Sequence, residues 1–151
     1  MKRFIDVHMS EVMAGKEDTI LHSDANNACL VIAAYDATHK VGGLAHAMFV
    51  SEECSKKLNH SYSRDAGKAI DEMIQDMELL GSTINDIEVC LVTGENVPHE
   101  KNDKNYLNRI HSAITLLKRK SIKFKQETTK RIIYAHCQRN PWSISVLLLQ
   151  F

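Results

Sequence analysis

The chain has 151 residues, of which 44% are hydrophobic and 25% are charged, a composition that is typical of a globular domain and argues against disorder. A chain of this length buries about 68–70% of its unfolded surface when it folds, so it builds a core without disulfides or a metal. Its 19 basic residues balance its 19 acidic residues, and without a net positive charge we expect no nucleic-acid partner.

The sequence predicts a cytoplasmic protein without membrane insertion. Asp6 and His8 interrupt the N-terminal segment where a signal peptide needs a hydrophobic stretch. The longest apolar run has the length of a strand, far below the ~20 residues that span a bilayer. The four cysteines are widely and irregularly spaced, so we expect reduced thiols rather than a disulfide framework.

The first third of the chain predicts strands. Their apolar patterns have strand length, and they cover Phe4–Met9, Asp18–His22, Leu30–Tyr35 and Val41–Val50. A turn is expected at Gly15. The apolar run from Leu30 is nearly continuous, which is typical of a strand buried on both faces. The polar segment Asp36–Lys40 predicts a hairpin connection, and Gly42 and Gly43 mark a bulge or a close backbone approach in the returning strand.

The rest of the chain alternates helices and strands. Apolar residues at three-and-four spacing predict amphipathic helices over Arg64–Leu80 and Asp103–Lys120, the first ending at Gly81. A polar loop is expected over Ser51–Ser63. The remaining predicted strands are Ile87–Val92, Ile122–Glu127, Arg131–His136 and Ser143–Phe151. This order predicts an α+β fold, a single-domain layered sandwich over residues 1–151 with β-sheets covered by two main helices.

Cys29 and His46 form the most specific pattern of the sequence. Cys29 follows a polar turn and precedes the apolar strand, and His46 lies seventeen residues later on the next strand. An imidazole beside a thiol can take its proton, and the thiolate can then attack an acyl carbon. The alternative is structural, because most intracellular cysteines act as small buried hydrophobes and a sheet histidine is often a core residue.

The residues around this pair suit an acyl-transfer site. The backbone N–H groups of a turn at Asn27 and Ala28 can hold an oxyanion. Gly42 and Gly43 remove side chains from the strand of the histidine and leave room for a substrate. Ser23 can form a hydrogen bond with the imidazole and fix its tautomer, which is the orienting role in a catalytic triad.

A zinc site is the competing interpretation of eight histidines and four cysteines. The sequence contains neither a C-x-x-C nor an H-x-x-x-H motif. A site built from Cys29, His46 and Cys54 has wider spacing than known zinc sites. We therefore predict no metal and no organic cofactor.

The segment Val41-Gly42-Gly43-Leu44-Ala45-His46, with a cysteine seventeen residues before its histidine, resembles the signature of the chemoreceptor glutamine deamidase family CheD. That family carries a hydroxyl residue six positions before the cysteine, where this chain has Ser23. The resemblance implies a CheD-like layered sandwich and an enzyme of chemotaxis signalling that hydrolyses the side-chain amides of protein glutamines to glutamate and releases ammonia. It implies chemoreceptor cytoplasmic domains as substrates, and a CheC-type phosphatase as partner.

The chain departs from that signature at the turn. Asn27-Ala28 stands where the family usually has Gly-Ser, and Ser23 stands where it usually has Thr. An alternative function therefore stays open, that of a catalytically impaired CheD-like adaptor that binds receptors or a CheC-type partner.

Overall fold

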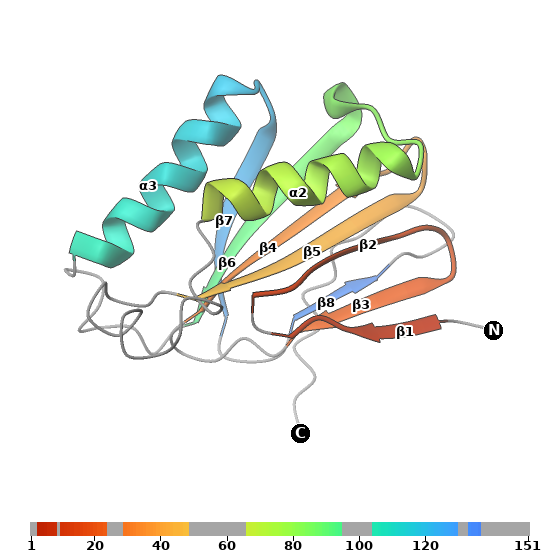
Figure 1. Cartoon of the computed structure of the whole chain (residues 1–151), viewed down its shortest axis with the longest axis horizontal. Coiled ribbons are helices and arrows are strands. Elements are labelled where there is room, and N and C mark those ends of the chain that lie inside the picture. The colour runs from red at the N-terminus through yellow and green to blue at the C-terminus, as the bar shows by residue number, and fades with distance from the viewer. Residues whose placement is uncertain are drawn as a thin grey trace.

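The computed structural model describes residues 3–8, 10–23, 29–48, 66–94, 104–129 and 133–136, and these form two β-sheets and two α-helices (Figure 1). The strands are β1 (Arg3–Asp6), β2 (Val12–Gly15), β3 (Thr19–Ser23), β4 (Cys29–Asp36), β5 (Val41–Met48), β6 (Ile87–Gly94), β7 (Lys123–Thr129) and β8 (Ile133–His136). The helices are α2 (Ala66–Leu79), α3 (Lys104–Arg119) and a short 3-10 helix, η2 (Ile84–Asp86).

The two sheets differ in size and in what covers them. The larger sheet has the strand order β2-β5-β4-β6-β7, and the smaller has the order β1-β3-β8. Figure 1 shows α2 and α3 on one face of the larger sheet and the smaller sheet on its other side. The described part of the chain is thus layered as helices, large sheet and small sheet.

The layer between the helices and the large sheet is built by the amphipathic pattern of α2 and α3. Small and apolar residues recur along α2 at three-and-four spacing and are buried: Ala66, Ala69, Ile70, Met73, Ile74 and Met77. They pack with the strand residues that point to the same side, such as Leu30, Ile32 and Ala45. These residues belong to one buried hydrophobic cluster, which stabilises the packing of the helices on the large sheet.

Both helices end in the same hydrogen-bonding pattern. At the end of α2, Gly81 has a φ of 106° and donates to the carbonyl of Glu78, while Ser82 donates to the carbonyl of Met77. This pair of bonds is the Schellman motif, which requires a left-handed residue and favours glycine. The predicted end of the first helix at Gly81 is confirmed. Ser121, with a φ of 56°, has the equivalent position after α3.

The layer between the two sheets has a smaller hydrophobic cluster and contains the buried polar residues Ser23 and His46. Val31 and Ala33 of β4, Leu44 of β5, and Cys90 and Val92 of β6 are buried on this side. Leu21 of β3 and Val7, which directly follows β1, pack against them. Strand β4 is therefore buried on both faces, as its continuous apolar run predicts.

The predicted α+β layered fold is confirmed, with two corrections in detail. The helices cover the large sheet alone among the described residues, because the small sheet occupies its other side. Gly15 is not a turn residue: it ends β2, where it pairs with Gly42, and the turn comes after it. The predicted loop over Ser51–Ser63 and the predicted strand over Ser143–Phe151 lie outside the described residues.

None of the described helices has the length and apolar composition that a membrane crossing requires.

Candidate active site

His46 lies near the end of β5 and is buried, with 5% of its surface exposed. Val31 of β4 is its Cα partner on one side. On the other side, Ser10 donates its N–H to the His46 carbonyl over 2.9 Å, and the His46 N–H donates to the Glu11 carbonyl over 3.1 Å. The main chain of His46 is thus held from both sides within the large sheet.

Ser23 reaches this histidine from the small sheet. It is the last residue of β3 and is 1% exposed. Its Oγ lies 2.8 Å from Nδ1 of His46, and its hydroxyl donates to the Val7 carbonyl over 2.9 Å. Residues 23 positions apart in the sequence therefore meet in the layer between the sheets, and the contact that the sequence predicts for Ser23 is present.

Cys29 begins β4, and its main chain is in register with the end of β5. Its Cα partner is Met48, and it stands two residues before Val31, the partner of His46. The strands that carry the predicted nucleophile and the predicted base are therefore direct neighbours. The side chain of Cys29, together with Asn27 and Ala28, lies outside what the structure describes.

Gly43 of β5 has other surroundings than the sequence predicts. A Cβ at Gly43 would lie 2.6 Å from Cγ of Met73 and 2.9 Å from Sδ of Met77, so α2 fills the space that the missing side chain leaves. The interpretation that Gly43 leaves room for a substrate is wrong, because the side chains of Met73 and Met77 approach the strand closely at this position. Gly42 lies four residues before His46, about 13 Å along an extended strand.

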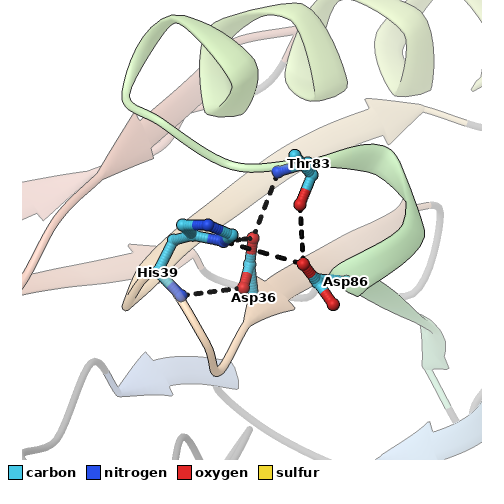
Figure 2. A network of polar contacts seen from close by, with 4 residues as sticks. All are labelled: Asp36, His39, Thr83 and Asp86. Carbon is cyan, nitrogen blue, oxygen red and sulfur yellow. Dashed lines mark hydrogen bonds and ion pairs between the residues drawn. The ribbon is translucent and has the colours of Figure 1, made fainter.

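A second polar cluster lies at the β4–β5 turn, next to the start of β6 (Figure 2). The buried carboxylate of Asp36 accepts the His39 N–H at 2.9 Å, the His39 ring at 2.7 Å and the Thr83 N–H at 3.3 Å. Burial raises the pKa of Asp36, but the bonds from His39, Ser82 and Thr83 outweigh it and lower that pKa below its ordinary value. The cluster keeps this carboxylate ionised.

The same cluster has the composition of a cation site. One ligand atom each of Asp36, His39 and Asp86 lie within 4.8 Å of one another. Each already has a hydrogen-bond partner there, since Asp86 accepts the Thr83 hydroxyl at 2.6 Å. These bonds account for the closeness of the three side chains. We therefore interpret the cluster as an anchor between the hairpin turn and the segment before β6.

Two of these features are not among the predictions made from the sequence. The Val7 carbonyl is a main-chain group, and any residue type at position 7 would supply it. The anchor of Asp36 and His39 has a local signal, an aspartate that precedes a turn, because such residues often bond the backbone within the turn. Its bond to Thr83 joins positions 47 apart and follows only from the fold.

Comparisons with known proteins agree with this architecture. The chain is 25% identical over 118 residues to a probable chemoreceptor glutamine deamidase CheD of Chlorobium luteolum, an alignment that covers 78% of this chain. This similarity agrees with the resemblance of the Val41–His46 segment to the CheD signature. The chain spans 58% of the length of that relative. No family model matches the chain.

Two solved structures that resemble the chain are more distant in sequence. The Neisseria meningitidis protein NMB0706, of family DUF152, superposes on this chain with a TM-score of 0.51 at 10% identity, covering 83% of this chain and 62% of that one. The Bacillus licheniformis hypothetical protein YfiH gives a TM-score of 0.47 at 14% identity, covering 77% and 49%. The likeness to the Neisseria protein is one of fold alone.

Proposed function

We propose that the CheD-like chain is a chemoreceptor glutamine deamidase in which Cys29 is the nucleophile and His46 the general base. The observation that carries the proposal is the buried contact of 2.8 Å between Ser23 Oγ and His46 Nδ1. A catalytic triad of this kind needs a nucleophile, a base and a third group that orients the base. Here the Ser23 hydroxyl contacts the His46 imidazole, and Cys29 begins the neighbouring strand. The name of the Chlorobium luteolum relative supports the same activity.

The strand register supports the proposed pairing of thiol and imidazole. Residues two apart on a strand share a face of the sheet, so the Cys29 side chain is proposed to share the face of Val31 and His46. Cys29 and His46 are then diagonal neighbours across an antiparallel pair, with Cα atoms about 7–8 Å apart. An imidazole spans most of that separation.

The proposed reaction has two steps. His46 takes the proton of the Cys29 thiol, the thiolate attacks the side-chain carbonyl of a glutamine, and backbone N–H groups around Asn27 and Ala28 hold the oxyanion. The C–N bond breaks and ammonia leaves with the proton that His46 returns. His46 then deprotonates a water molecule, which attacks the thioester, releases glutamate and restores the thiol.

The partners of this reaction are part of the proposal. The substrates are glutamines in the cytoplasmic domains of chemoreceptors, and a CheC-type phosphatase is the proposed partner. Both follow from the resemblance of the Val41–His46 segment to the CheD signature. The reaction draws on side chains and water, so no cofactor enters it.

The test is incubation of the protein with chemoreceptor cytoplasmic fragments, followed by mass spectrometry for glutamine-to-glutamate conversion and an assay for ammonia. We expect conversion with the wild type and a loss of about 100-fold or more in Cys29→Ala and in His46→Ala. Cys90→Ala is the matched control, because it removes a buried thiol from the layer between the sheets. Equal conversion by wild type and Cys29→Ala would contradict the proposal, and binding without conversion by the wild type would support the adaptor alternative instead.

A further inference from the structure

The Ser23 hydroxyl has two neighbours of different chemical character. Its Oγ lies 2.9 Å from the Val7 carbonyl oxygen and 2.8 Å from Nδ1 of His46. A carbonyl oxygen can only accept a hydrogen bond, whereas a ring nitrogen donates or accepts according to the tautomer. Both distances fall within the range of hydrogen bonds.

A serine hydroxyl carries a single proton, and this decides the direction of both bonds. The proton must point to Val7, because otherwise two oxygens with lone pairs would face each other at 2.9 Å in a buried layer. The Ser23 oxygen is then an acceptor toward His46. Nδ1 of His46 must therefore carry a proton and donate it.

We propose that the Val7 carbonyl, acting through Ser23, holds the proton of neutral His46 on Nδ1, so that Nε2 is the nitrogen that accepts and returns protons. The tautomer follows from the two contacts alone, and its catalytic meaning rests on the proposed function. Ser23 is a positioning residue in this account. Val7 contributes through its main chain.

The network is compatible with proton transfer without rearrangement. In the imidazolium both nitrogens are donors, so Nδ1 keeps its bond to Ser23 when Nε2 takes up a proton. The hydroxyl keeps its bond to Val7 in both states. Only Nε2 changes its protonation, and the hydrogen bonds around Nδ1 stay the same. The surroundings of the ring therefore need no reorganisation, which favours proton transfer at Nε2.

The segment that supplies the carbonyl is itself held in place. Val7 donates its N–H to the His22 carbonyl over 2.7 Å, which continues the pairing of β1 with β3. Glu11 closes the following turn, since its N–H donates to the His8 carbonyl and its carboxylate accepts the His8 N–H. The Glu11 carbonyl in turn accepts the N–H of His46. One short segment thus orients both the hydroxyl and the histidine.

The test is nitrogen-15 NMR of the full-length protein labelled in histidine, recorded above the pH at which His46 is protonated. We expect the pattern of the tautomer with Nδ1–H and a lone pair on Nε2 in the wild type, and the same pattern in Ser23→Thr, which keeps the hydroxyl. Ser23→Ala is expected to give a mixture of tautomers. The ring signals of His39 serve as the control, because Asp36 holds that ring at a separate site.

A wild-type spectrum with the proton on Nε2 and a lone pair on Nδ1 would overturn the inference, as would an unchanged pattern in Ser23→Ala. These spectra need no substrate. A protein that shows the Nδ1–H tautomer without deamidating receptor fragments would contradict the proposed function and leave the inferred tautomer intact. Where conversion is measurable, Ser23→Ala should lower it about tenfold and Ser23→Thr should restore it.

Discussion

At the scale of single residues, Ser23 and Asp36 are buried polar groups that each bond to a distant segment of the chain. Ser23 joins the small sheet to His46, and Asp36 joins the β4–β5 turn to Thr83. Both are fully surrounded by protein, so their hydrogen bonds cannot be replaced by water without local opening. Ser23 belongs to the proposed reaction, whereas Asp36 lies at the opposite end of β4 from Cys29.

Asp36→Asn should lower the free energy of unfolding by about 2–3 kcal/mol at neutral pH, because an amide cannot accept all the donors that surround the carboxylate. Urea denaturation followed by circular dichroism measures this value. Asp86→Asn is the control: Asp86 is exposed, and its loss should cost less than about 1 kcal/mol. An equal effect of the two substitutions would contradict the anchoring role.

The same carboxylate predicts a pH dependence with a definite sign. The pKa of Asp36 is lowered in the folded state from 3.8, so its contribution is complete above that unfolded value and is lost as the pH falls through the lower folded value. The difference in stability between wild type and Asp36→Asn should therefore be constant near neutrality and shrink below about pH 4. A difference that stays the same in acid would contradict the lowered pKa.

The sequence predicts these residues unevenly. Ser23 and His46 are predicted because spacing relative to Cys29 is a property of the sequence, and their contact is present. The role of Gly43 is wrongly predicted, because a glycine shows that space is needed but not which neighbour fills it. The Val7 carbonyl is not predicted at all, since a main-chain acceptor leaves no mark in the sequence.

At the scale of elements, local patterns predict the strongest helices and strands. The apolar residues of α2 recur at the three-and-four spacing of a helix, and the apolar run of β4 has the length of a buried strand. Strand β2 is not predicted because its four residues, Val-Met-Ala-Gly, do not alternate, and they become a strand by pairing with β5. Which strands belong to which sheet depends on such non-local pairs. A single sequence therefore does not predict the two sheets.

The close packing of α2 on β5 gives a prediction at this scale. Gly43→Ala should lower the free energy of unfolding by about 1–3 kcal/mol, because the new methyl group overlaps the buried side chains of Met73 and Met77. Denaturation of the variant measures the effect. In a double-mutant cycle, Met73→Ala should cost less in the Gly43→Ala background than alone. Strictly additive effects would contradict the close approach.

At the scale of the whole described molecule, the layers separate stability from chemistry. The helix-covered side of the large sheet carries the larger hydrophobic cluster, and on its other side His46 meets Ser23 of the small sheet. The small sheet supplies the orienting hydroxyl, the residue after β1 supplies its carbonyl partner, and the large sheet supplies the histidine and the strand of Cys29. The proposed site therefore needs both sheets to be packed together.

The measurement that tests this account most directly is the rate at which iodoacetamide modifies each cysteine of the native protein at neutral pH, followed by peptide mass spectrometry. Paired with His46, Cys29 should be modified far faster than Cys54, Cys90 and Cys137, and His46→Ala should remove that advantage. Ser23→Thr should retain it. A Cys29 that reacts no faster than the other three thiols, or one whose rate is the same without His46, would contradict the proposed thiol–imidazole pair.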